Sequence, residues 1–236
     1  MLPILYQDDD LIAIHKPAGL LVHRTGLDAG ETRFAVQLLR DQIGQPVWPV
    51  HRLDKGTSGV LVMALHADAA SALGQAFQSH DAVRKTYRAI VRGWPADEGL
   101  IDHPLRRMDD DACANARATE VQTALTRYRT LARYTLPMAH GAFAHTRCAL
   151  IELQPETGRR HQLRRHCKHM AHPIIGDATH GKGPLNRALA QHLGVQRLWL
   201  HATALRLPHP ANGTTLHLAA PCGKEWDIWA HAAEHL

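Results

Sequence analysis

The stretch HRLDKGTSGVLVMAL, from His51 to Leu65, contains the clearest structural signal in this chain of 236 residues. Its last residues, from Val60 onward, form a continuous apolar run, which is typical of a strand buried on both faces. The residues before them are polar and of the kinds that take part in chemistry. Apolar residues recur at helical spacing from Ala70 to Phe77, after a possible cap at Asp68. We therefore expect a polar loop, a buried strand and a helix in that order.

The residues that precede this stretch predict two strands and a helix. Short apolar runs indicate strands over Ile4–Tyr6 and Leu11–His15, separated by the acidic turn QDDD. The loop KPAG follows directly, and a helix is expected from about Thr32 to Ile43.

The residues that follow it are mainly strand-like. From Lys85 to Val91 the chain alternates, which places Tyr87, Ala89 and Val91 on one face. Trp226 and Trp229 indicate a short closing helix. Further strands are expected near residues 121–134, 143–153, 197–207 and 214–218.

One segment, Arg160–Ala171, reads as a basic amphipathic helix that ends before Pro173. Its apolar residues recur at helical spacing, and its other face is expected to carry His161, Arg164, Arg165 and Lys168. Because helices and strands mix irregularly and no linker interrupts them, the sequence favours an α+β fold in one domain over residues 1–236, with a mixed, mainly antiparallel sheet flanked by helices.

Composition describes an ordinary globular protein with a basic balance. Hydrophobic residues make up 45% of the chain, and 27 Lys and Arg against 22 Asp and Glu leave a net charge of +5, so a polyanionic partner is plausible. No signal peptide or membrane span is evident, which favours the cytoplasm. The cysteines are widely separated and are expected to be reduced: Cys113, Cys148, Cys167 and Cys222.

Several familiar motifs are excluded. HRLD is similar to part of the kinase catalytic loop, but the chain has neither a Gly-rich G-x-G-x-x-G segment nor Asp-Phe-Gly. No Walker loop or G-x-S-x-G elbow is present either. The histidines between His161 and His180 lack the carboxylate or cysteine partners of known zinc motifs, so we expect no metal.

Three distant segments match one family when taken together: KPAGLLVH at 16–23, HRLDKGTSG at 51–59 and ELQPETGRRHQLRRH at 152–166. Their order, spacing and content resemble the pseudouridine synthases of the RluA type, over nearly the whole chain. The opening ILYQDDDLIAIHKPAGLLVHR and His180 in GDATHG resemble the subgroup of tRNA pseudouridine-65 synthases. The resemblance implies a catalytic domain with a central active-site cleft and no separate N-terminal RNA-binding domain.

The resemblance also implies an activity and the residues that perform it. The reaction converts a uridine within RNA to pseudouridine, without a cofactor. Asp54 matches the single essential carboxylate, acting as nucleophile or base. Arg164 matches the arginine that keeps that Asp ionised and oriented, and Tyr87 matches the tyrosine that stacks on the flipped base.

Basic residues are expected to contact the RNA. Arg52 resembles the arginine that enters the space vacated by the flipped base. The other candidates for phosphate contacts are Lys16, Arg159, Arg160, Arg165 and Lys168. We expect folded RNA as the only partner and a monomeric enzyme.

Two alternatives remain open at this stage. The target could be ribosomal RNA, since the same motifs serve both substrates. The protein could also be an RNA-binding factor without catalysis, although a pure binder has no need of a carboxylate beside an anionic ligand. Replacing Asp54 by Asn separates catalysis from RNA binding alone.

Overall fold

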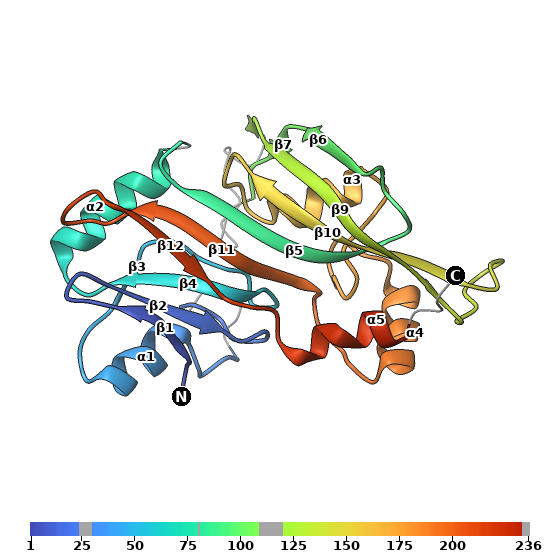
Figure 1. The fold of residues 1–236 in the computed structure, drawn as a ribbon, viewed down its shortest axis with the longest axis horizontal. Helices are drawn as coiled ribbons and strands as arrows, with labels where there is room; N and C mark the ends of the chain where they lie inside the picture. The colour runs from blue at the N-terminus through green and yellow to red at the C-terminus, as the bar shows by residue number, and fades with distance from the viewer. Residues whose placement is uncertain (24–29, 80, 109–119, 233–236) are drawn as a thin grey trace. The chain divides into compact units, whose positions relative to one another are not determined.

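The computed structural model describes residues 1–23, 30–79, 81–108 and 120–232 (Figure 1). The chain forms two compact units. The first comprises residues 1–85, 104–122 and 202–220, and the second comprises residues 86–103, 123–201 and 221–236. Within the described ranges no helix is both long and apolar enough to cross a membrane.

The first unit is built on the strand that the sequence predicted most clearly. In β4 (Ser58–Ala64) all seven residues are buried. It pairs along its length with β2 (Leu11–Lys16), and β1 (Ile4–Gln7) pairs with the other edge of β2. The prediction of these three strands is confirmed. The unit also contains β3 (Trp48–Pro49), which pairs with β4, and β12 (Thr215–Ala219), which pairs with β11 (Leu200–Pro208); β7 (Leu105–Arg106) and β8 (Val121–Gln122) pair with each other.

The two helices of the first unit begin at places that the sequence did not predict correctly. α1 (Ala35–Ile43) starts three residues later than expected, because Phe34 is extended and the backbone N–H of Ala35 donates to the carbonyl of Leu21. α2 (Ala67–Gln78) is capped by His66, whose Nδ1 accepts from the backbone N–H of Ala69, so the predicted cap at Asp68 is wrong. Asp68 lies in the first turn, where its charge suits the helix dipole.

Four strands form the sheet of the second unit, in the order β5, β10, β9, β6, and all three pairs are antiparallel. β5 begins at the end of the first unit. The antiparallel pairing of the strands in both units, together with the helices, confirms the predicted α+β class with a mainly antiparallel sheet. The bounds are β5 (Arg84–Arg92), β6 (Glu98–Asp102), β9 (Leu125–Leu136) and β10 (Thr146–Pro155).

Helices cover both faces of this sheet. The predicted alternation of β5 is confirmed, since Ala89 and Val91 pack in one cluster with Leu163 and Cys167 of α3 (Gln162–His169), whereas Ile90 points to the opposite cluster. That second cluster contains leucines of α4 (Gly183–Leu193) and the tryptophans of the last two helical segments, η3 (Lys224–Asp227) and α5 (Ile228–Ala232). The predicted closing helix is therefore present.

Two further expectations need correction. α4 was not predicted, although Pro184 at its start, Leu185, Leu189 and Leu193 on one side and Gly194 after its end are ordinary helix signals. β11 begins at Leu200 rather than near residue 197. Of the cysteines, Cys113 lies outside the described residues, and the other three are not joined by disulfides.

Candidate active site

Asp54 lies in a tight turn that leads into β4. The backbone N–H of Thr57 donates to the carbonyl of Asp54 over 3.0 Å, which closes the turn. Leu53 is buried and anchors it, whereas Asp54 is half-buried and Arg52 is exposed. The turn thus leaves Asp54 partly exposed and Arg52 exposed, and the roles predicted for both stay predictions.

Lys16 is fully buried and holds this turn in place. Its ammonium donates to the carbonyls of Pro17 (2.9 Å), Leu20 (2.6 Å) and Lys55 (3.2 Å). The backbone N–H of Gly19 also donates to the carbonyl of Lys55 over 2.8 Å. The ammonium therefore joins the loop after β2 to the Asp54 turn. This placement argues against the predicted contact of Lys16 with RNA, because the side chain has no exposed surface for a phosphate.

His51 and Gly59 fix the two ends of the HRLDKGTSG segment. The Nε2 of His51 accepts from the backbone N–H of Val62 over 2.9 Å, and its ring stacks on Phe77 at 4.5 Å. Burial, together with the nearby charge of Lys85, lowers the pKa of His51 to about 3. At Gly59 (φ 114°) a Cβ atom would lie 2.1 Å from the carbonyl oxygen of Ala202, so only glycine fits.

Arg164 in the second unit forms a buried bidentate pair with Asp177. Its Nε and Nη2 each donate to a carboxylate oxygen over 2.8 Å. The backbone N–H groups of Thr179 and His180 donate to the same carboxylate, each over 2.9 Å. Burial by itself would raise the pKa of Asp177, but these donors, Arg164 first, lower it below its ordinary value. The pair fixes the plane of the guanidinium.

The polar face predicted for this helix is partly buried. Arg164 is 8% exposed, and Gln162 and His166 on the same helix are also buried. They bond to neighbouring strands: Gln162 donates to the carbonyl of Leu125, and the Nδ1 of His166 bonds the hydroxyl of Thr126. Helical periodicity separates apolar from polar residues, but it does not show that a polar side chain will be buried beside a partner.

The other predicted residues of the second unit keep some exposed surface. Tyr87 is half-buried and packs against the cluster that contains Leu163. Arg159 donates from its Nε to the carbonyl of Thr123 over 3.1 Å. Burial lowers the pKa of Arg165. The predicted phosphate contacts in this unit that remain at least partly exposed are Arg159, Arg160, Arg165 and Lys168.

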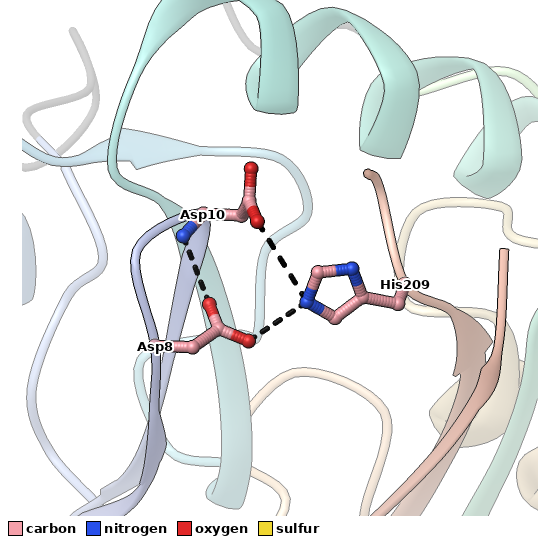
Figure 2. Close-up of side chains that lie close together, drawn as sticks. All are labelled: Asp8, Asp10 and His209. Atoms are coloured by element: carbon pink, nitrogen blue, oxygen red, sulfur yellow. Dashed lines mark hydrogen bonds and ion pairs between the residues drawn. The ribbon is translucent and has the colours of Figure 1, made fainter. Parts of the chain in front are cut away.

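One group of side chains in the described ranges has the composition of a metal site: Asp8, Asp10 and His209 (Figure 2). The Nδ1 of His209 accepts from the backbone N–H of Ala211, so its Nε2 carries the proton and donates to Asp8 over 2.8 Å. A metal would have to displace that proton. Burial alone would raise the pKa of Asp8, but donors including Tyr6, Leu11 and His209 lower it to about 2. The geometry is that of a hydrogen-bonded bridge between two turns.

A model of the RNA pseudouridylate synthase family matches residues 10–169. The chain belongs to this family. tRNA pseudouridine synthase C of Vibrio cholerae serotype O1 is 51% identical over 228 residues, which cover 96% of this chain and 93% of that protein. The protein of the same name from Yersinia pestis is 46% identical over 244 residues, covering 100% and 95%. The solved structure of Human RNA Pseudouridylate Synthase Domain Containing 1 has a TM-score of 0.77 at 25% identity, covering 100% of this chain and 89% of that one.

The family predicted from the motifs is thus confirmed, and the pseudouridylate synthase assignment makes this chain an enzyme that acts on RNA. Asp54 and Arg52 belong to the first unit of this synthase, and Arg164 and Tyr87 belong to the second. Their individual roles stay predictions. The sequence did not predict Asp177 as the partner of Arg164, although Asp177 lies in the GDATHG segment; nothing in that segment indicates which side chain Asp177 contacts.

Proposed function

We propose that this protein converts a specific uridine in tRNA to pseudouridine, at position 65 if it follows the subgroup that its motifs resemble. The observation that carries the proposal is the similarity to proteins named tRNA pseudouridine synthase C, at 46% to 51% identity over nearly the whole chain. The partner would be RNA alone, with the protein acting as a monomer in the cytoplasm.

The proposed chemistry needs one carboxylate and no cofactor. The bond between the base nitrogen and the ribose carbon breaks, and a bond from a ring carbon to the same ribose carbon forms. The proton that leaves this ring carbon is balanced by one gained at the freed nitrogen. Asp54 would act as nucleophile or base beside the ribose, and its position in a turn held by buried Lys16 supports a fixed approach.

Arg164 would keep Asp54 ionised and oriented. An arginine suits this role because its guanidinium is always charged and has further donors when one carboxylate is already bound. Asp177 holds the Nε and Nη2 edge of Arg164, which supports a guanidinium with a fixed direction rather than a mobile one. Tyr87 would stack on the flipped base, and Arg52 would fill the space that this base leaves in the RNA.

The test compares the wild type with Asp54→Asn on unmodified tRNA and ribosomal RNA transcripts, followed by mapping of new pseudouridines at single-nucleotide resolution. Asp9→Asn, at an exposed position of the first unit, is the matched control. We expect one modified tRNA position with the wild type and the control, and none with Asp54→Asn, which should still bind RNA. Product in ribosomal RNA alone would overturn the tRNA assignment, and product with Asp54→Asn would remove Asp54 from the mechanism.

A further inference from the structure

A pocket of about 410 Å³ lies in the second unit. It forms where the end of β5 and the start of β10 meet the hairpin between β9 and β10. Its volume is in the lower part of the range of ligand pockets. Its lining includes the charged, imidazole and aromatic side chains of Arg92, His140, Phe143, His145 and Arg147, and we call it the Phe143 pocket.

Phe143 presents its ring to solvent from a tight turn. It is one of only three phenylalanines in the chain, and 69% of it is exposed. His140 and Phe143 exchange two backbone hydrogen bonds, of 2.9 and 3.2 Å, and Gly141 between them has a φ of 62°. The turn therefore fixes the backbone from which the ring projects. A single exposed ring is common at protein surfaces, but this one lies beside a pocket and offers a flat face on which a planar ligand can stack.

The charge of the pocket is positive. Arg92 and Arg147 line it, and none of the described lining residues is acidic. The guanidinium of Arg147 lies 4.4 Å from the ring centre of Trp94, and the indole N–H of Trp94 donates to the carbonyl of Tyr134 over 3.1 Å. This stacking holds Arg147 in place while its donors stay able to bind an anion.

A second groove in the same unit provides a comparison. It is lined by Arg127 and Arg129, and also by Glu98 and Glu152. There the arginines are neutralised, because Arg127 pairs with Glu156 and Arg129 pairs with Glu152. Of these two openings, only the Phe143 pocket combines an exposed aromatic ring with arginines and no lining carboxylate. That combination is what single nucleotides of RNA require: a ring for the base and a cation for the phosphate.

We propose that the Phe143 pocket binds a nucleotide of the substrate RNA other than the reacting uridine, with its base stacked on Phe143 and its phosphate contacting Arg147 and Arg92. This inference rests on the proposed function, since it assigns a second contact to the same RNA. His140 and His145 can add hydrogen bonds to the base or ribose. The site would hold the RNA at a distance from the reacting base and contribute to the choice of substrate.

The test measures the affinity of an unmodified tRNA transcript for the full chain, independently of turnover. Phe143→Ala should weaken binding by about 5-fold to 100-fold, the range found when one base loses its aromatic platform. Phe143→Trp should restore it, because a larger ring stacks equally well. Leu100→Ala, at another exposed apolar position of the second unit, is the control and should bind like the wild type.

Photo-cross-linking identifies the occupant. With p-benzoylphenylalanine in place of Phe143, irradiation of the complex should attach the tRNA transcript, and the same group in place of Leu100 should not. Cross-linking only to a second copy of the chain would overturn the proposal and make the pocket an interface between copies, as would wild-type affinity for Phe143→Ala. Cross-linked RNA without any pseudouridine product would leave this site standing and refute the proposed activity instead.

Discussion

His51 is the first residue of the HRLDKGTSG segment, and its neutral imidazole leads to a prediction about acid stability. Nε2 accepts the backbone N–H of Val62, a bond that a protonated ring could not accept. In the native protein burial holds the pKa of His51 near 3. In the unfolded chain the same ring titrates near about 6.5. Between these values only the unfolded state binds the extra proton, so acid favours unfolding.

The size of the effect follows from the difference between the two states. For each pH unit below the unfolded pKa, the free energy of unfolding falls by about 1.4 kcal/mol, which gives a loss of about 2 kcal/mol between pH 7 and pH 5. A native pKa one unit higher would give the same result, because pH 5 still lies above it. His51 as a residue keeps some exposed surface, and screening by water reduces the effect. We therefore expect a loss of about 1–2 kcal/mol from this group.

His51→Gln isolates this contribution, because the amide oxygen of Gln can accept the same bond from Val62 but does not titrate. The free energy of unfolding is measured by urea denaturation at pH 7, 6 and 5. On acidification the wild type should lose about 1–2 kcal/mol more than His51→Gln. His217→Gln, at an exposed position on β12, should follow the wild type. Parallel curves for the wild type and His51→Gln would refute the assignment of a buried neutral imidazole.

Two further predictions concern the buried charges. Lys16→Met should lower the free energy of unfolding by about 3 kcal/mol and reduce turnover, because three carbonyls lose their ammonium donor and the Asp54 turn loses its support. Lys55→Met, at an exposed position, is the control and should lower the free energy of unfolding by under about 1 kcal/mol. Equal decreases for the two variants would contradict the supporting role of Lys16. Asp177→Asn should cost about 3–5 kcal/mol in urea denaturation at pH 7, because Arg164 stays buried without its counter-charge. Folding lowers the pKa of Asp177, so its ionised form stabilises the protein fully above the ordinary carboxyl pKa of about 4, and this stabilisation is lost as pH falls through the lower pKa of the native state. The difference in unfolding free energy between the wild type and Asp177→Asn should therefore narrow in acid. A difference that does not change with pH would count against the ion pair.

The order of strands and helices could be predicted largely from local patterns. The apolar run in β4 and the alternation of β5 each depend on residues a few positions apart, and the structure confirms both. Helix ends were less predictable. The cap of α2 is an imidazole at His66, a residue type that does not stand out from the sequence as a cap.

The sequence by itself determined the family and the candidate catalytic residues, because its three motifs are long, ordered and specific, and the match to the family is confirmed. It could not show which polar residues would be buried. Lys16 was predicted to contact RNA and Arg164 to orient Asp54, yet in the structure each is buried, with Lys16 donating to the carbonyl of Lys55 and Arg164 to the carboxylate of Asp177. The cost of burying a charge is offset only when the folded chain brings such partners within hydrogen-bond distance. Only the tertiary structure therefore determines which cations are buried, and only the tertiary structure shows that Phe143 and Arg147 line one pocket.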